Sequence, residues 1–168
     1  KTSGFIAGAD VNEFRGATDP KQVEEAIGRA HAVIDRLEAL RIPTLAVIHG
    51  FCLGGGLEVA LACHYRVATK EAKLGLPEVK RGLAAAAGGL LRLPKILPYQ
   101  LAMEIAITGD PLSATVAHHH GLVNRLAEPG HALTVARELA ARVAANGPLA
   151  VRATKQVLAM SAKYTDPD

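Results

Sequence analysis

The segment Cys52–Glu58 reads Cys-Leu-Gly-Gly-Gly-Leu-Glu, which is the pattern of a strand, a glycine turn and the first turn of a helix. The first amide groups of a helix have no partner within it, and the peptide dipoles add roughly half a positive charge at that end. Glycine lets the backbone approach a ligand closely. A second segment, Phe5–Asp10, reads Phe-Ile-Ala-Gly-Ala-Asp and also turns at glycine after an apolar run. Together they predict a site that stabilises a developing oxyanion.

Two carboxylates accompany the glycine turn. Glu58 lies within the expected first helical turn, and Glu78 follows twenty positions later. Taken singly, each has a structural explanation, since a first-turn glutamate suits the helix dipole and a glutamate after Pro77 fits a solvated loop. The combination of an anion-binding turn with two carboxylates instead indicates acid–base chemistry on a carbonyl compound.

The composition narrows the class of protein. A length of 168 residues fits one domain, and 49% hydrophobic residues supply an ample core. The net charge is +3 and aromatic residues make up 4%, without a basic stripe interleaved with aromatics. We therefore expect no nucleic-acid partner, and no apolar run approaches the ~18 residues of a membrane span. Cys52 and Cys63 predict buried free thiols in a reducing, cytoplasmic compartment.

The ends of the chain carry an expectation of their own. The sequence begins at Lys1 and enters an apolar motif almost at once, and it ends with Lys163–Asp168 soon after a helical pattern. We expect residues 1–168 to form a single domain that is incomplete at both ends.

Helical and strand patterns alternate along the chain, which predicts the α/β class. Asp19-Pro20 is a helix start, and apolar residues at helical spacing continue to about Leu40. Strands are expected at Phe5–Ala7, Thr44–His49, Tyr65–Ala68 and Leu122–Leu126, with Leu74–Pro77 a strand or loop. Further helices are expected at Leu57–Cys63, Ala84–Leu93, Leu101–Ile107, from Ser113 to Gly121, at about Ala132–Ala145 and at Pro148–Ser161.

The order and spacing of three motifs, Phe5–Asp10, Gly54–Glu58 and Gly75–Val79, resemble the crotonase superfamily. The closest resemblance is to enoyl-CoA hydratase, including the hydratase domains of multifunctional fatty-acid oxidation proteins, and it extends through Ala87–Pro94 and Gly121–Val123. It implies a spiral of ββα units with C-terminal helices, assembled as a homotrimer or as a hexamer of two trimers. It also implies an acyl-CoA thioester substrate and no separate cofactor, because coenzyme A belongs to the substrate. From this resemblance we expect the sequence to lack the N-terminal part and the C-terminal tail of the family fold.

Carried over residue by residue, the resemblance places the oxyanion hole on the backbone N–H groups of Ala7 and Gly55. Substrate contacts then come from Ala7, Gly8, Ala9, Asp10 and Gly55. It assigns water activation to Glu58 and protonation of the α-carbon to Glu78. Two neighbouring carboxylates can divide these roles because like charges close together raise one pKa.

The expected reaction is reversible addition of water to a trans-2-enoyl-CoA to give a 3-hydroxyacyl-CoA. The presence of both glutamates favours it over a Δ3,Δ2-enoyl-CoA isomerase, which needs one proton-shuttling carboxylate. Another crotonase-type acyl-CoA enzyme, such as a thioester hydrolase or a lyase, and a non-catalytic acyl-CoA-binding paralogue stay open. The segment Ala84–Leu91 departs from the Pro-Gly-Ala-Gly-Gly-Thr pattern of the family, which leaves the acyl-chain preference open.

The run His118–His120 invites a metal-binding interpretation. Consecutive residues project around a helix rather than toward one point, so the three imidazoles do not offer good ligand geometry. We therefore expect no metal site.

Overall fold

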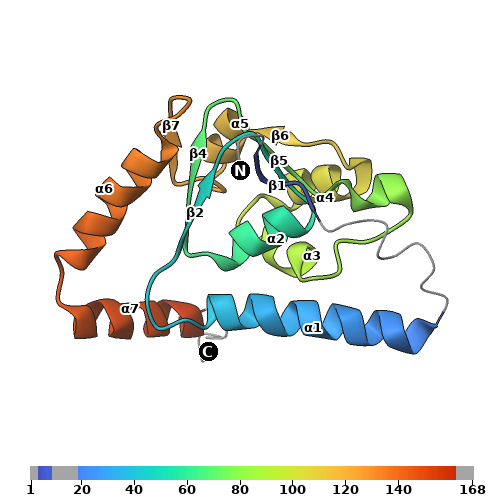
Figure 1. Ribbon diagram of the computed structural model, residues 1–168, viewed down its shortest axis with the longest axis horizontal. Helices are drawn as coiled ribbons and strands as arrows, with labels where there is room; N and C mark the ends of the chain where they lie inside the picture. The colour runs from blue at the N-terminus through green and yellow to red at the C-terminus, as the bar shows by residue number, and fades with distance from the viewer. Residues whose placement is uncertain (1–3, 9–18, 162–168) are drawn as a thin grey trace, which may run out of the picture.

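The computed structural model of the chain describes residues 4–8 and 19–161, and it arranges their strands in two small sheets (Figure 1). The sheet orders are β1-β3-β5-β6 and β2-β4-β7. The named strands pair in parallel, apart from β5 with β6, which is antiparallel. The strands are β1 (Gly4–Ile6), β2 (Leu45–Ile48), β3 (Phe51–Leu53), β4 (Tyr65–Thr69), β5 (Lys73–Gly75), β6 (Leu112–Ser113) and β7 (Arg125–Ala127).

The chain crosses between the two sheets in a repeating way. β2 and β3 follow each other directly but belong to different sheets, and β4 and β5 do the same. The first pair leads into the helix α2 (Gly55–Ala62), and the second leads into the 3-10 helix η2 (Pro77–Arg81). This repetition agrees with the ββα spiral that the sequence resemblance implies, and it places the starts of α2 and η2 after neighbouring strands β3 and β5.

The long helix α1 (Pro20–Glu38) forms as its sequence predicts. The side chain of Asp19 accepts a hydrogen bond from the backbone N–H of Lys21 at 3.0 Å, and Pro20 occupies the first helical position. The remaining helical elements are α3 (Gly89–Arg92), η3 (Leu93–Lys95), α4 (Tyr99–Thr108), α5 (Ala114–His119), α6 (Ala132–Ala144) and α7 (Pro148–Ser161).

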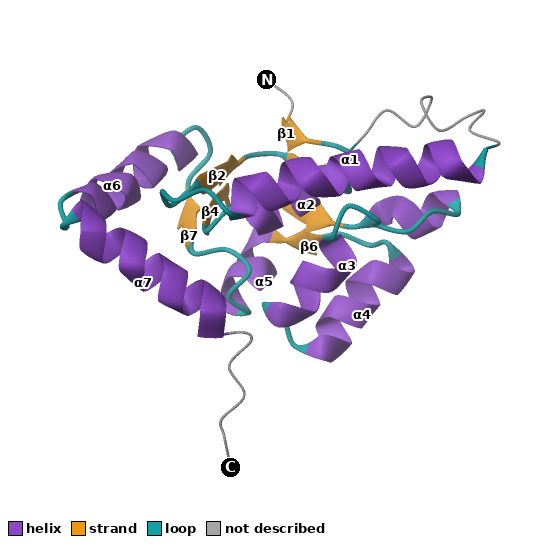
Figure 2. Cartoon of the chain, turned by 90° about the horizontal axis from the view of Figure 1, so that it is seen from below, coloured by secondary structure: helices purple, strands orange, loops and turns teal. Residues whose placement is uncertain are grey.

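The helices surround the sheets on several sides. α1 crosses α2, as Figure 2 shows from below, and α3 packs against α2, whereas α4 packs against η2 and η3. α6 and α7 meet at a corner, and the end of α7 lies beside the end of α1 at the lower edge of Figure 1. The Lys155 ammonium of α7 donates to the carbonyl oxygen of Glu38 at the end of α1, at 3.3 Å. None of the helices in the described ranges has the length and apolar character needed to cross a bilayer.

The main core lies between α2 and strands of both sheets, where side chains such as Ile48, Leu57 and Leu74 are almost fully buried. Cys52 and Cys63 are free and buried, which confirms the prediction for the two thiols. Burial raises the pKa of Cys52 to about 12, so this thiol stays protonated as an apolar core residue.

Arg66 is buried near these thiols, and its guanidinium is satisfied by carbonyl oxygens. It donates to Leu122 at 2.6 Å, to Ala60 at 3.0 Å and to Cys63 at 2.7 Å. A buried cation needs such partners to offset its desolvation. The contacts tie the C-terminal end of α2 to the segment that follows α5, and so fix the axial position of α2.

Two predicted elements are wrong in extent. The segment expected as a helix over Ala84–Leu93 becomes α-helical only at Gly89, because Gly88 adopts a φ of +103° as the residue before the helix. The strand expected from Leu122 begins at Arg125 instead. Gly121, at φ +83°, ends the preceding helical segment, and the N–H groups of Leu122 and Val123 both donate to the carbonyl oxygen of Ala117.

Candidate functional site

The N-terminus of α2 is formed by the glycine turn that the sequence singles out. Gly54 adopts a φ of +57° and donates its N–H to the carbonyl oxygen of Gly75 at 2.9 Å. The first N–H groups that donate a hydrogen bond within the helix are those of Leu57 and Glu58, and both donate to the carbonyl oxygen of Gly54. The amides of Gly55 and Gly56 therefore precede the ladder, at the positive end of the helix dipole.

The end of β1 lies directly against this turn. A Cβ atom on Gly56 would stand 2.2 Å from the carbonyl oxygen of Ile6, so only glycine permits this approach. A Cβ on Gly54 would stand 3.6 Å from the Cα of Gly8, which itself adopts a φ of +109°. Ala7 lies between Ile6 and Gly8, and it is exposed. The fold thus brings the segment around Ala7 beside the helix start at Gly55; Ala9 and Asp10 lie outside the described residues.

Glu58 is buried in the first turn of α2, with 3% of its surface exposed. Its Oε1 accepts a hydrogen bond from the backbone N–H of Gly89 at 2.9 Å. Burial raises the pKa of this carboxyl, while the backbone donors of Gly89 and Ala87 and the charges of His31 and Arg92 act in the opposite direction. Glu58 is therefore a buried acid whose ionised form is stabilised by backbone N–H donors and by nearby positive charge.

Glu78 lies in η2, next to the glycine turn. Its Oε1 would be 2.9 Å from a Cβ atom on Gly54, so the missing side chain at that glycine makes room for the carboxyl group. Within the described part of the chain, the buried Oε2 has no hydrogen-bond partner. Burial raises the pKa of Glu78, and the charge of Glu58 raises it further. The backbone N–H of Glu78 itself and the charge of Arg81 lower this pKa.

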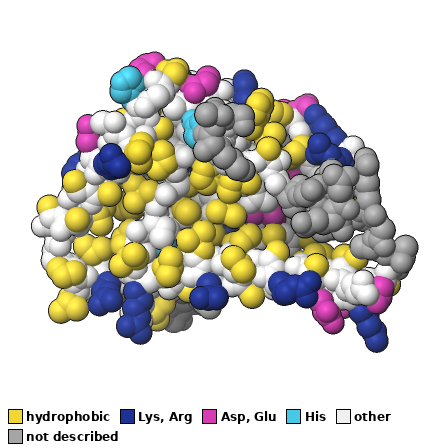
Figure 3. Space-filling view, in the orientation of Figure 1, with side chains coloured by type: hydrophobic (Ala, Val, Ile, Leu, Met, Phe, Trp, Pro, Cys, Tyr) yellow, Lys and Arg dark blue, Asp and Glu magenta, His cyan; other side chains and the backbone are white. Residues whose placement is uncertain are grey.

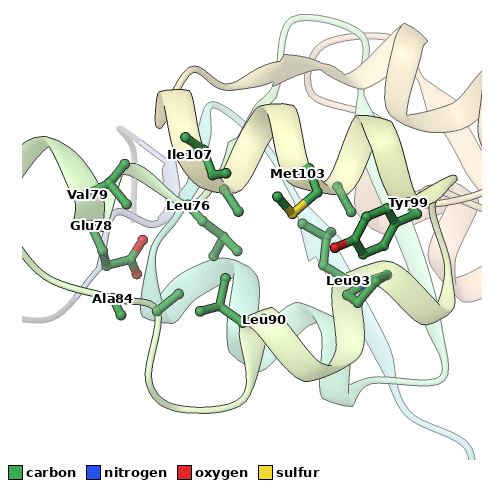
Figure 4. A pocket seen from close by; sticks show the side chains of 13 residues that line it. Leu76, Glu78, Val79, Ala84, Leu90, Leu93, Tyr99, Met103 and Ile107 are labelled. Carbon is green, nitrogen blue, oxygen red and sulfur yellow. The ribbon is translucent and has the colours of Figure 1, made fainter.

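A largely apolar pocket of about 370 Å³ opens beside Glu78 (Figure 4). Glu78 lies toward one end of the pocket, and Tyr99 and Leu93 lie toward the other. Leu90 of α3 and Met103 of α4 project into it from two sides. Among the described residues that line the pocket, Glu78 carries the only charge. An acyl chain is the kind of group that such a pocket can bury.

Sequence reasoning identified both carboxylates and the glycine turn, and the structure brings Ala7, Gly8, Gly55, Glu58 and Glu78 into one region. It missed the role of Gly89, which donates its N–H to Glu58. A Cβ atom there would meet the Glu58 side chain at 3.0 Å, so the packing requirement is also present. The pocket residues of α4 were missed as well, because their pattern looks like that of any amphipathic helix.

The three consecutive histidines have separate surroundings. The Nδ1 atom of His118 lies 2.7 Å from the carbonyl oxygen of Val123, and the rings of His119 and His120 meet edge to face at 4.9 Å. Over residues 4–8 and 19–161, no group of three or more His, Cys, Asp or Glu side chains is arranged to hold a metal ion.

Comparison with known proteins gives a consistent result. A family model described as enoyl-CoA hydratase/isomerase matches residues 2–168. The chain is 42% identical over 159 residues to enoyl-CoA isomerase/hydratase fer4 of Mycosarcoma maydis, covering 94% of this chain and 58% of that protein. It is 35% identical to the short-chain-enoyl-CoA hydratase of Clostridium acetobutylicum, over 92% of this chain and 59% of that one.

Solved structures agree with this similarity. The crystal structure of enoyl-CoA hydratase from Bacillus anthracis superposes with a TM-score of 0.91 at 35% identity, over 98% of this chain and 64% of that chain. The chain thus spans roughly three fifths of the length of each of these three proteins.

Proposed function

The chain belongs to the enoyl-CoA hydratase/isomerase family, and on this premise we propose that the protein is an enoyl-CoA hydratase. It would add water reversibly to a trans-2-enoyl-CoA and release a 3-hydroxyacyl-CoA. The observation that carries the proposal is the pair of carboxylates, Glu58 and Glu78, which flank one glycine turn in different environments.

The proposed oxyanion hole consists of the backbone N–H groups of Ala7 and Gly55. As water adds to C3 of the enoyl group, the π electrons move toward the carbonyl and the thioester oxygen becomes an enolate oxygen. Donors preorganised for that charge stabilise the transition state, and losing one such donor typically costs about 3–4 kcal/mol. The small residues on both segments leave room for the thioester, as the close approach of β1 to α2 requires.

The two glutamates would divide the proton transfers. Glu58 takes a proton from the attacking water, whose oxygen bonds to C3, and Glu78 gives its proton to C2. The step leaves Glu58 protonated and Glu78 ionised, and exchange with solvent restores the starting state. The surroundings support this division, because Glu58 has backbone donors and nearby cations that stabilise its charge. Glu78 instead has an unsatisfied buried Oε2 and faces the charge of Glu58.

The pocket beside Glu78 supplies a place for the acyl chain. A chain that enters it would pass the Glu78 carboxyl and run toward Tyr99 between α3 and α4 (Figure 4). An apolar wall of this kind binds methylene groups and excludes water from the proton-donating side.

A second candidate function is isomerisation of a 3-enoyl-CoA to the 2-enoyl-CoA. One observation favours it: Glu78 lines the apolar pocket, whereas Glu58 does not. A single carboxylate at that position can remove a proton from C2 and return it to C4.

The trimeric or hexameric assembly, the cytoplasmic location and the absence of a separate cofactor stay predictions.

Two single substitutions in the full-length protein test the proposal. Glu58→Gln and Glu78→Gln keep the shape of each side chain and remove its acid–base capacity. With crotonyl-CoA, we expect each to lower kcat by about 100-fold or more, measured as loss of the enoyl-thioester absorbance. The matched control is Glu71→Gln, an exposed glutamate outside the site, which should keep the wild-type rate.

The outcomes separate the candidates. Near-full hydration by both Glu58→Gln and Glu78→Gln would refute the hydratase assignment. If Glu58→Gln still isomerises a 3-enoyl-CoA, and the wild type does not hydrate crotonyl-CoA, the isomerase is favoured. Binding of crotonyl-CoA by the wild type without turnover of either substrate would indicate a non-catalytic acyl-CoA-binding protein.

A further inference from the structure

Arg92, at the end of α3, links that helix to α1 through two carboxylates. Its Nη2 donates to Asp35 Oδ1 and to Glu38 Oε2, both at 2.7 Å, and its Nε donates to the same Glu38 oxygen at 3.1 Å. The Arg92 side chain is 11% exposed, whereas those of Asp35 and Glu38 are 62% and 54% exposed. A guanidinium fork that bridges two acids fixes geometry as well as charge.

The Arg92 side chain also packs against the turn at Gly88, which precedes α3. A Cβ atom on Gly88 would lie 2.0 Å from Arg92 Nη1 and 3.6 Å from His31 Cε1 of α1. The guanidinium therefore occupies the space that a side chain at Gly88 would take. The residue after this turn is Gly89, whose N–H donates to Glu58.

From this chain of contacts, we propose that Arg92 is a positioning residue of the site, which ties α3 to Asp35 and Glu38 of α1 and so holds the Gly89 N–H against the Glu58 carboxylate. The inference rests on the proposed function, because it concerns how the proposed base is held. α3 is only four residues long, so its own helical hydrogen bonds do little to fix its place. Three charge-assisted hydrogen bonds to a nineteen-residue helix provide that anchor instead.

The charge of Arg92 contributes alongside its geometry. The groups that act on the pKa of Glu58 are the backbone donors Gly89 and Ala87 and the side chains of His31 and Arg92. Glu78 of η2 faces the charge of Glu58, which raises its own pKa. Arg92 favours the ionised carboxylate and opposes the effect of burial on the pKa of Glu58. Losing the guanidinium should therefore loosen the Gly89 hydrogen bond and also make Glu58 harder to ionise.

The test compares Arg92→Met with Arg92→Lys in the full-length protein. We expect Arg92→Met to lower kcat for crotonyl-CoA by about 10- to 100-fold with little change in KM, since the loss is one of alignment. The acid limb of its kcat/KM profile should move to higher pH. Arg92→Lys keeps the charge but not the fork, so its acid limb should stay in place while kcat recovers only in part. Arg29→Met is the matched control, because Arg29 of α1 makes only an exposed pair with Glu25 at 3.9 Å within the described residues.

A second pair of substitutions removes the charges of the two α1 carboxylates that accept hydrogen bonds from Arg92. It tests the same contact if Arg92→Met does not fold. Asp35→Asn with Glu38→Gln alters two exposed side chains and leaves Arg92 charged. We expect kcat to fall while the acid limb does not move to higher pH. Wild-type kcat and an unshifted acid limb in Arg92→Met, or wild-type kcat in the double variant, would overturn the proposal and leave a purely structural ion pair.

A readout without turnover separates this proposal from the proposed function. In protein labelled with ¹⁵N-glycine, the Gly89 amide, assigned by its loss in Gly89→Ala, should follow the titration of Glu58. The midpoint should rise in Arg92→Met and stay in Arg92→Lys. If the wild type turns over no enoyl-CoA but shows these shifts, the proposed function fails and the positioning role holds; an amide unaffected by Arg92→Met overturns the positioning role.

Discussion

At the scale of single residues, the site depends on how differently two glutamates are surrounded. Glu58 accepts a backbone hydrogen bond and lies near cations, whereas the buried Oε2 of Glu78 has no partner within the described residues. Burial raises the pKa of both side chains. The protein thus keeps two acids in places that oppose their ionisation, which costs stability at neutral pH.

This cost gives a prediction for Glu78→Gln. The folded-state pKa of Glu78 is raised, so its contribution to stability is present below its ordinary value of 4.5 and is lost as the pH rises through the folded-state pKa. We therefore expect Glu78→Gln to have a higher Tm than the wild type at pH 7. The difference should shrink toward zero as the pH falls below the ordinary value. Thermal denaturation across this pH range checks it, and the exposed Glu71→Gln should show no such trend.

At the scale of elements, the decisive contact is the approach of β1 to the start of α2. The two segments are far apart in sequence, and the glycines at Gly8, Gly54 and Gly56 allow their backbones to come together. The positive φ of Gly54 directs the chain from β3 into α2, and Arg66 holds the other end of that helix. The amides of the proposed oxyanion hole are positioned by this packing rather than by either segment alone.

Adding one methyl group at Gly56 should disrupt the contact. In Gly56→Ala, the new Cβ would lie 2.2 Å from the carbonyl oxygen of Ile6, and backbone cannot move aside cheaply. We expect the free energy of unfolding to fall by about 2–3 kcal/mol, with loss of hydration activity. The control is Gly28→Ala in α1, where nothing lies within 4 Å of the new Cβ. That variant should gain up to about 1 kcal/mol, because alanine favours a helix interior over glycine. Equal stability of the two variants in denaturant titrations would contradict the packing argument.

At the scale of the whole molecule, one face of the protein is notably apolar. Figure 3 shows hydrophobic side chains spread over the face that carries α6 and α7. Leu149, Val157, Leu158 and Met160 of α7 are each more than 60% exposed. Extended apolar surface of this kind marks an interaction site, and a trimer or a pair of trimers stays the predicted partner arrangement.

The pocket between α3 and α4 should set the preference for acyl-chain length. Each methylene buried contributes about 0.8 kcal/mol, which is roughly a fourfold gain in kcat/KM. Met103→Trp fills the space between Leu90 and Tyr99, so we expect it to lower kcat/KM for octenoyl-CoA far more than for crotonyl-CoA. Val116→Trp, on α5 and outside the pocket, is the control. A preference for chain length that Met103→Trp leaves unchanged would mean that the acyl chain lies elsewhere.

Much of this protein follows from local patterns in its sequence. The start of α1 at Asp19-Pro20, the turn at Gly54 and the buried thiols of Cys52 and Cys63 were predicted, because capping, backbone freedom and apolar context act over a few neighbouring residues. The order and spacing of the motifs also predicted the family, which the family model over residues 2–168 confirms.

The rest depends on backbone conformation and packing that no sequence pattern specifies. The short α3, the use of Gly89 as a donor to Glu58, the link from Arg92 to α1 and the pocket between α3 and α4 were not predicted. The contacts of Gly89 and Arg92 join residues far apart in sequence. The start of α3 depends on the conformation of Gly88, and the pocket depends on how η2, α3 and α4 pack. An alanine-rich segment has no periodic pattern that specifies its partner. The sequence by itself therefore determined which groups are available for the chemistry, whereas tertiary packing decided their separation, their burial and hence the direction of their pKa shifts.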